Sequence, residues 1–291
     1  MIIAVTGASG SIGIELIPFL ESLGHTVIKI SSSRPSDNSF SYTFNQLADK
    51  EIQSKVDLFI HLASLNANIN SKNFNEEIGL TKKVLSSLPS LGCSKLIFFS
   101  SAKVYGDNCF SENIFTEFSD LNPEDIYGIA KKKCEDLIFQ ESSINALIFR
   151  LPPLINYSTS NLGKLLTLAR KNLPIPTFKA GFHNQRSFIS MVNIQTIMSF
   201  ITKDISFIKQ HEIYNISDDG FISVNDLVKI HKRNFLIVFP DFLFNFCIKI
   251  SFLKTPLKKL FGNFALDNSK LKSEMDVTLT STKDALLSIN Q

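Results

Sequence analysis

The sequence has no tryptophan and only four cysteines in 291 residues. The cysteines form no CxxC pair and show no metal-ligand spacing, so we expect free thiols, no bound metal and a reducing cytoplasm. A net charge of +3, with 20% charged residues, is too small to indicate a nucleic-acid partner. The N-terminus lacks a basic segment and its apolar run is short, so no signal peptide is expected.

Long apolar runs are also scarce. The most apolar stretch, residues 235–253, is interrupted by Pro240, Asp241, Asn245 and Lys249. A helix needs about 20 predominantly apolar residues to span a bilayer, and an aspartate inside it is costly. We therefore predict no transmembrane segment. The favoured interpretation of this stretch is a buried or groove-lining helix, and the alternative is peripheral contact with a membrane.

What the chain does have is a glycine-rich turn near its start. Residues 2–5 are an uninterrupted apolar run, residues 6–13 are TGASGSIG, and residues 14–23 have the periodicity of an amphipathic helix. Glycines spaced by three let a pyrophosphate approach the backbone N–H groups at the start of such a helix. The spacing differs from GxGxxG, so alone it predicts either a nucleotide site or a tight strand-to-helix turn.

Strand and helix patterns alternate through the first half of the chain. The expected strands cover residues 2–5, 25–30, 56–62, 95–100 and 146–150, and the expected helices cover 14–23, 74–88 and 126–140. This alternation indicates right-handed βαβ units and an α/β fold, a Rossmann-type doubly wound parallel sheet. Ligands of such sheets bind beyond the carboxyl ends of the strands.

The pattern changes after Pro152 and Pro153. The expected helices there cover 162–171, 192–202 and 224–231, and short strands are expected at 187–189 and 213–216. We assign residues 1–155, with a contribution from about 185–216, to a dinucleotide-binding domain. Residues 156–184 and 217–291 are assigned to a smaller, mixed substrate-binding domain.

Two further polar features belong to this expected sheet and its helices. Ser100 and Ser101 end an apolar strand, where a hydroxyl can hydrogen-bond a reacting oxygen or simply cap the strand. Tyr127 and Lys131 are four residues apart and share a helix face. A lysine cation can lower the pKa of a tyrosine hydroxyl towards the value that acid–base catalysis needs, although many such pairs lie on a solvated face.

Taken together and in this order, the glycine turn, the strand-end serine and YxxxK resemble the extended short-chain dehydrogenases/reductases. Within that group the chain is similar to the NAD-dependent epimerase/dehydratase enzymes of nucleotide sugars. The resemblance continues through HLAS at 61–64, FFSSAKVYG at 98–106, RLPP at 150–153, QRSFI at 185–189 and LDNSKL at 266–271. The second half looks most like bacterial 4-epimerases and 4-ketoreductases of UDP-N-acetylhexosamines that make surface-polysaccharide precursors.

This resemblance implies roles for the matching residues. Tyr127 is the expected acid/base, Lys131 tunes it and holds the nicotinamide ribose, and Ser101 orients the substrate oxygen. The other expected cofactor contacts are Gly7, Gly10, Ser11, Ile12, Gly13, Ser31, Arg34, Leu62, Ala63, Ser64 and Pro153. The expected substrate contacts are Lys103, Asn161 and Arg186. Arg186 matches an arginine that pairs with the UDP diphosphate, a role that suits a planar guanidinium, and a surface cation near a turn is the alternative.

The chain also departs from the family pattern. NAD-preferring relatives carry an acidic residue at the end of the second strand, where it bonds the ribose 2′-OH. Here the position is Ser31, with Arg34 nearby, which favours NADP(H) over NAD unless Arg34 is merely a solvated cation. Lys103, in the Ala-Lys that follows the serines, replaces part of the Asp-Glu of the dehydratases, so dehydration is not expected. Glu77 stands where relatives often carry asparagine.

These features predict a cytoplasmic enzyme that moves a hydride between a nicotinamide and C4 of a nucleotide sugar. It would be either a 4-epimerase or a 4-ketoreductase, which share the same catalytic parts. The alternative is a non-catalytic NAD(P)-binding sensor of the same fold, although such proteins usually lose the tyrosine or the lysine. The resemblance further implies a homodimer, formed through the helices near 74–88 and 126–140.

Overall fold

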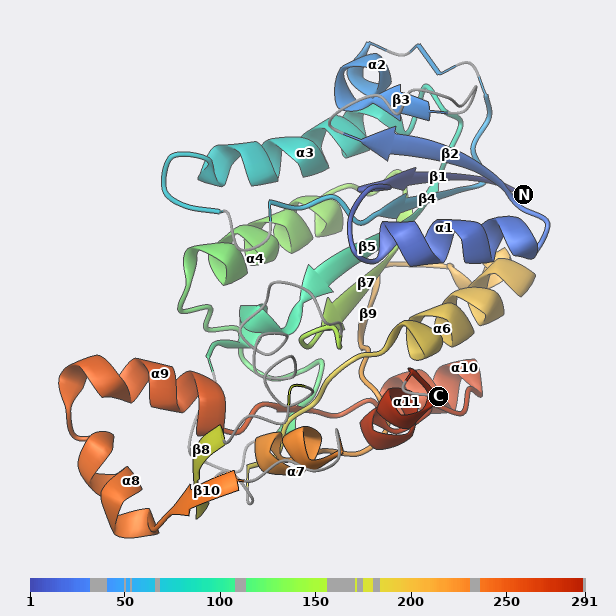
Figure 1. Cartoon of the computed structure of the whole chain (residues 1–291). Helices are drawn as coiled ribbons and strands as arrows, with labels where there is room; N and C mark the ends of the chain where they lie inside the picture. The colour runs from blue at the N-terminus through green and yellow to red at the C-terminus, as the bar shows by residue number, and fades with distance from the viewer. Residues whose placement is uncertain are drawn as a thin grey trace.

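A seven-stranded parallel sheet forms the centre of the protein (Figure 1). The computed structural model describes residues 1–31, 41–49, 51–52, 54–65, 69–107, 114–155, 171, 175–179, 184–230 and 236–289. In spatial order the strands are β3 (Ser41–Thr43), β2 (Thr26–Ser31), β1 (Ile2–Thr6), β4 (Leu58–His61), β5 (Lys95–Ser101), β7 (Asn145–Leu151) and β9 (Glu212–Asn215). The expected doubly wound α/β fold is therefore confirmed.

The strand order changes direction between β1 and β4. The chain proceeds from β1 outwards to β2 and β3, then returns to β4 on the other side of β1. Thr6 at the end of β1 is in register with His61 at the end of β4. In open parallel sheets this switch point leaves a crevice at the carboxyl ends of the strands, where ligands bind.

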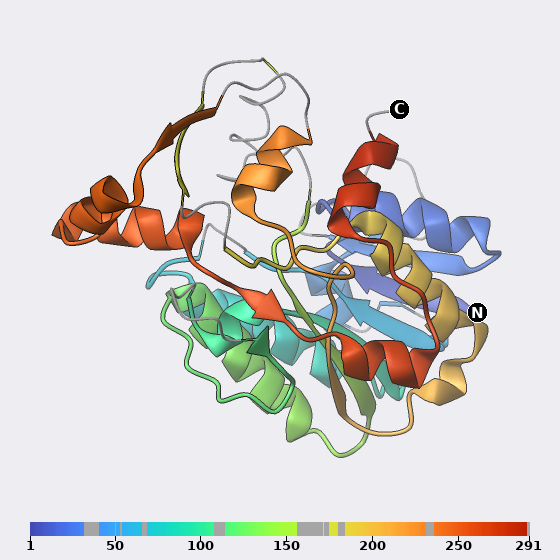
Figure 2. The ribbon, with the colours of Figure 1, turned by 90° about the horizontal axis from the view of Figure 1, so that it is seen from below.

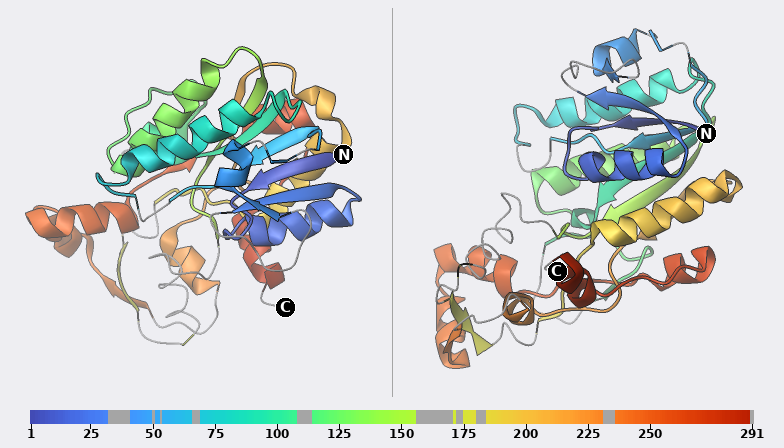
Figure 3. Two further views of the ribbon diagram at one scale, coloured as in Figure 1. Left: turned by 90° about the horizontal axis from the view of Figure 1, so that it is seen from above. Right: turned by 45° about the vertical axis from the view of Figure 1, so that its right-hand side comes forward.

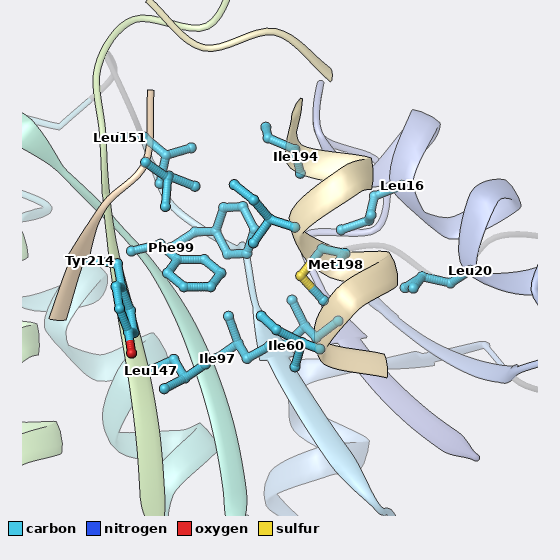
Figure 4. Close-up of a cluster of buried hydrophobic side chains, with 14 of the residues drawn as sticks. Leu16, Leu20, Ile60, Ile97, Phe99, Leu147, Leu151, Ile194, Met198 and Tyr214 are labelled. Atoms are coloured by element: carbon cyan, nitrogen blue, oxygen red, sulfur yellow. The ribbon is translucent and has the colours of Figure 1, made fainter. Parts of the chain in front are cut away.

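Helices cover both faces of the sheet (Figures 1 and 3). α1 (Gly13–Ser22) and α6 (Met191–Lys203) pack on one face, and α2 (Phe44–Ala48), α3 (Phe74–Ser87) and α4 (Ile126–Phe139) pack on the other. Neighbouring residues of β4 serve the two cores: Ile60 joins Leu16 and Met198 (Figure 4), and Phe59 joins the opposite cluster. Burial on both faces explains why the strands are continuous apolar runs.

Small elements, most of them from the second half of the chain, lie outside the main sheet. These are the strand pairs β6 (Ile114–Phe115) with β11 (Ala265–Leu266) and β8 (Ile175–Phe178) with β10 (Leu236–Phe239), and the helices α7 (Val224–Lys229), α8 (Asp241–Cys247), α9 (Ser251–Phe261), α10 (Ser269–Met275) and α11 (Thr282–Ile289). Figure 2 shows α8 and α9 extending away from the body of the molecule. The expected helix over 162–171 falls almost entirely outside the described residues.

The apolar stretch 235–253 is not a single buried helix, so that expectation was wrong. Pro240, which has an extended conformation, ends β10 and precedes α8, because a proline cannot continue the backbone hydrogen bonding. Phe242 is 73% exposed and Phe246 is 62% exposed. None of the helices in the described part of the chain is long and apolar enough to cross a membrane. The strand expected at 187–189 is reduced to isolated bridges at Arg186 and Ile189.

Candidate functional site

The glycine turn between β1 and α1 is closely packed at the switch point. Gly7 has φ +72°, and a Cβ there would lie 2.8 Å from the backbone nitrogen of Ala63. A Cβ on Gly13 would lie 2.4 Å from the carbonyl oxygen of Gly7. The N–H of Gly7 donates to the carbonyl of Ile30 on β2 at 2.9 Å, and that of Gly10 donates to Gly7 at the same distance. A side chain at Gly7 would therefore push the turn away from the segment after β4, and one at Gly13 would disrupt the turn itself.

This turn presents hydrogen-bond donors at the start of α1. Ile12 is the N-cap and makes no side-chain cap bond. Within the described residues, the N–H groups of Ser11, Ile12 and Gly13 have no acceptor. Free N–H groups and the positive end of the helix dipole together suit a phosphate. The residues present thus fit the pyrophosphate of a dinucleotide.

The segment after β4 is fixed beside the glycine turn. The N–H of Leu62 donates to the carbonyl of Thr6 at 3.3 Å, and that of Ala63 donates to the Thr6 hydroxyl at 3.3 Å. His61 Nδ1 is hydrogen-bonded to the same hydroxyl at 2.7 Å, and its Nε2 to Thr81 at 3.1 Å. Burial, with a smaller effect of Lys131, lowers the pKa of His61 to about 3, so the ring is neutral.

Tyr127 and Lys131 lie on α4, whose first turn packs against the segment after β5. Asp125 caps this helix by accepting the N–H of Gly128 at 2.7 Å. A Cβ on Gly128 would lie 2.6 Å from the Lys103 carbonyl oxygen, so the small residue lets α4 approach the 3₁₀ turn Ala102–Tyr105. Gly128 thus determines how closely its neighbour Tyr127 can approach the end of β5.

Lys131 is inside the protein and not on a solvated face. Its side chain is 1% exposed, and its Nζ is 5.8 Å from the centre of the Tyr127 ring. The ammonium also lies 3.1 Å from a carboxylate oxygen of Glu77 on α3. Burial alone would lower the pKa of Lys131, but the charges of Tyr127 and Glu77 outweigh it and raise that pKa. Lys131 is therefore a cation beside the tyrosine, as acid–base chemistry requires.

The two strand-end serines have different partners. Ser100 donates its hydroxyl proton to Glu135 at 2.5 Å, within a buried ion pair. The Ser101 oxygen accepts the N–H of Lys103 at 3.2 Å and caps the 3₁₀ turn. Of the two, Ser101 is thus the one at the carboxyl end of β5 and outside that ion pair. The ammonium of Lys103 pairs with Asp107, and with Asp125 at 3.6 Å.

The remaining predicted residues are spread around this edge of the sheet. Ser31 is buried at the end of β2. Pro153 follows β7, and its carbonyl accepts the N–H of Ile189 at 3.1 Å. Arg186 donates from a terminal nitrogen to the Lys259 carbonyl at 2.7 Å, and burial lowers its pKa to about 10, which leaves it charged at neutral pH. Arg34 and Asn161 lie outside the described residues.

Some residues of the site were not recognised from the sequence. Glu77 was noted only as a departure from the family, and nothing in its neighbours signals an ion pair with Lys131. Glu135 and Arg150, which hold Ser100, also received no role. No three His, Cys, Asp or Glu side chains gather as metal ligands among the residues that the structure describes.

The chain is similar in sequence to known proteins. The model of a family described as "NAD dependent epimerase/dehydratase family" matches residues 3–217. A UDP-glucose 4-epimerase from Vibrio cholerae is 24% identical over an alignment of 313 positions, which covers 98% of this chain and 89% of that protein. The match to the family model spans most of the chain and includes the glycine turn and the Tyr127–Lys131 pair.

Solved structures share the fold. MoeE5 in complex with UDP-glucose and NAD superposes with a TM-score of 0.74 at 18% identity, covering 99% of this chain and 96% of that one. The UDP-N-acetylglucosamine 4-epimerase from Bacillus cereus gives 0.73 at 17% identity, with both chains fully covered (100% and 100%). Human epimerase family protein SDR39U1 (isoform 2) with NADPH gives 0.73 at 16% identity, covering 99% and 98%. The chain belongs to the NAD-dependent epimerase/dehydratase family.

Proposed function

We propose that this protein catalyses NAD(P)-dependent hydride transfer at C4 of a UDP-sugar, as a 4-epimerase or a 4-ketoreductase of surface-polysaccharide precursors. The observation that carries the proposal is the buried Lys131 cation beside Tyr127. The pair lies on α4, which packs against the sheet whose switch point holds the glycine turn. Burying a lysine is costly unless its charge is paired, and here Glu77 keeps the buried lysine charged where the cation can act on Tyr127.

Each residue of the site has a distinct role in the proposed reaction. A bound NAD(P) supplies the hydride acceptor and donor. In the reductive direction Tyr127 donates its hydroxyl proton to the oxygen on C4, and in the oxidative direction its phenolate takes that proton back. Lys131 stabilises the phenolate and binds the nicotinamide ribose. Ser101 hydrogen-bonds the same substrate oxygen and holds it near Tyr127.

The substrate end is assigned to the second half of the chain. Arg186 carries the cation that would bind the diphosphate of a UDP-sugar, with Lys103 and Asn161 as further contacts. The names of the Vibrio cholerae and Bacillus cereus relatives support a UDP-sugar. We further propose that residues 156–184 and 217–291 act as the substrate domain, and that two copies associate through α3 and α4.

Ser31 is the residue that bears on the choice of cofactor. It ends β2, where a carboxylate would bond the 2′-OH of NAD, and a hydroxyl leaves room for the 2′-phosphate of NADP. We therefore propose NADP(H) over NAD. Structures of relatives hold either dinucleotide, NAD in MoeE5 and NADPH in SDR39U1.

One experiment separates the candidate activities. The purified protein is denatured, the released dinucleotide is identified by mass spectrometry, and fresh protein is given UDP-glucose or UDP-N-acetylglucosamine deuterated at C4. An epimerase converts each sugar to its C4 epimer, keeps the deuterium and consumes no added cofactor. A ketoreductase instead leaves these sugars unchanged. When it is given a 4-keto nucleotide sugar in a separate reaction, it consumes one NADPH for each molecule that it reduces. Dinucleotide binding without turnover of either substrate class would contradict the proposal and favour a sensor.

A further inference from the structure

A buried carboxylate lies against the lysine of the candidate site, and the proposed reaction assigns it no step. Glu77 comes from α3 and Lys131 from α4, and their side chains are 2% and 1% exposed. A Glu77 oxygen is 3.1 Å from the Lys131 nitrogen. Because both groups are shielded from water, each charge depends on the other for its stabilisation.

The same carboxylate holds the segment that follows β4. One oxygen of Glu77 accepts the hydroxyl proton of Ser64 at 2.7 Å, and the other accepts the N–H of Leu65 at 2.6 Å. Residues 62–64 are those expected to line the cofactor. Glu77 therefore connects two parts of the candidate site, the cofactor segment and the catalytic lysine.

The other titratable groups around Lys131 do not supply a fixed negative charge. His61 on β4 is neutral, because burial and Lys131 lower its pKa to about 3. Cys134 on α4 is a thiol, because burial raises its pKa. β5 contributes only the Phe99 carbonyl, 3.4 Å from Nζ, and an aromatic ring. Glu77 is therefore the carboxylate partner of Lys131 in the described part of the chain.

We propose that Glu77 is a positioning residue that keeps Lys131 protonated inside the protein and holds it against the cofactor segment. The catalytic role of Lys131 in this proposal rests on the proposed function. The ion pair with Glu77, and its effect on the charge of Lys131, do not depend on it. A neutral amide at this position would keep part of the hydrogen bonding to Ser64 and remove the charge.

The test is the melting temperature of Glu77→Gln as a function of pH, without substrate. In the wild type the raised pKa of folded Lys131 keeps its stabilising contribution intact up to the unfolded pKa of about 10.4. In the variant, burial without a carboxylate depresses the pKa of Lys131, so the unfolded chain binds more protons and stability rises with pH. We expect a melting temperature lower by roughly 6 °C or more at pH 6, with the gap narrowing towards pH 10.

Two variants serve as controls. Glu76→Gln makes the same change at an exposed position of α3 and is expected to leave the melting temperature unchanged. Glu77→Gln with Lys131→Met removes both charges, so its melting temperature is expected to exceed that of Glu77→Gln at pH 6 and to follow the wild-type pH dependence. A gap that stays constant with pH would show a purely structural role and overturn the inference.

The activity of Glu77→Gln relative to the wild type is expected to change with pH in the opposite direction to its relative stability. As Glu77→Gln loses its lysine proton with rising pH, Tyr127 loses the neighbouring cation, and the ratio of its kcat to that of the wild type is expected to fall between pH 7 and pH 9. A ratio independent of pH would contradict the effect on Tyr127. Failure of the wild type to turn over any nucleotide sugar would overturn the proposed function and leave the melting result standing.

An independent observation concerns the arm formed by β10, α8 and α9 (Figures 1 and 2). Its inner side is an aromatic cluster in which the Phe178 ring lies 5.3 Å from Phe244 and 5.5 Å from Phe261. Three other phenylalanines point outwards: Phe242, Phe246 and Phe252 are 73%, 62% and 77% exposed. The cluster already stabilises the arm, and among the described residues the three exposed rings take no part in that packing.

The charges around these rings indicate what covers them. Lys249 and Lys254 are exposed in the same arm, where Asp241 is the only acidic residue of the stretch 241–261. A symmetric dimer through this surface would bring like charges together. We infer that the arm binds the surface of an anionic membrane, with the phenylalanines at the acyl boundary and the lysines at the headgroups.

Flotation with vesicles tests this second inference. We expect binding to vesicles of phosphatidylglycerol and phosphatidylcholine, little binding to pure phosphatidylcholine, and weakening by salt. Replacing Phe242, Phe246 and Phe252 by serine is expected to weaken binding about tenfold or more, because three apolar side chains no longer insert. Phe118→Ser, at an 89% exposed position in a turn outside the arm, is the matched control. The inference of membrane binding would be overturned by an absence of vesicle binding, or by a dimer that the serine variants dissociate.

Discussion

Replacing Tyr127 by phenylalanine is expected to lower kcat for a nucleotide sugar by about 10²–10⁴-fold, the range typical of a lost general acid–base group. The ring remains to pack 5.8 Å from the Lys131 nitrogen, but the proton that must move between enzyme and C4 oxygen is gone. The Kd for NAD(P) is expected to change by no more than about threefold, because the cofactor keeps the glycine turn and Lys131. Steady-state turnover and a cofactor titration measure the two quantities.

A matched variant tests whether the effect belongs to this hydroxyl. Tyr42 is a partly buried tyrosine on the edge strand β3, away from α4, so Tyr42→Phe removes a hydroxyl without touching the site. Its kcat is expected to equal that of the wild type. Turnover of Tyr127→Phe at the wild-type rate would contradict the catalytic assignment of Tyr127. Equal losses of kcat and cofactor affinity would instead indicate a damaged fold.

The sequence predicted those parts of the site that depend on local geometry. The spacing of Tyr127 and Lys131 determines that they share a face of any helix, and the glycine spacing determines a tight turn. The contact between Lys131 and Glu77 depends instead on how α3 packs beside α4 on one face of the sheet. No local pattern encodes that packing, so the carboxylate could be noticed only as an unusual residue.

The same limit applies to the fold. Strands buried on both faces are apolar runs, so β1, β4, β5 and β7 were predicted to within about two residues of their ends. Strands β6 and β11 have two residues each and are far apart in the sequence, at Ile114–Phe115 and Ala265–Leu266, so there is no periodicity to detect. Stretch 235–253 was interpreted as buried because it is apolar, but exposure of Phe242 and Phe246 depends on an arm that only the tertiary structure shows.

A second buried ion pair holds the end of β5 in place. The guanidinium of Arg150 on β7 donates to Glu135 on α4, at 2.7 Å for the shortest bond, and their side chains are 2% and 3% exposed. Glu135 also accepts the Ser100 hydroxyl proton, and Arg150 donates to the Tyr105 oxygen at 3.0 Å. Tyr105 in turn donates to Asn215 on β9 at 2.7 Å. This network joins three strands and α4 beside Ser101.

Removing one member of this network is expected to have a large effect on stability. Glu135→Gln leaves the Arg150 cation buried without its anion, which typically costs about 3–5 kcal/mol in the free energy of unfolding. For a chain of this size the melting temperature should fall by roughly 6 °C or more. Thermal unfolding followed by circular dichroism measures the change, and urea titration gives the free energy.

The neighbouring residue on the same helix provides the control. Asp136 pairs with Lys132 at 3.0 Å, but both side chains are exposed, so Asp136→Asn is expected to cost less than about 1 kcal/mol. Glu135→Gln combined with Arg150→Met should regain part of the lost stability, because no unpaired charge stays buried. Equal effects of the two single variants would contradict the buried pair. A loss of kcat well below the melting temperature, in Glu135→Gln alone, would show that the network also positions Ser101.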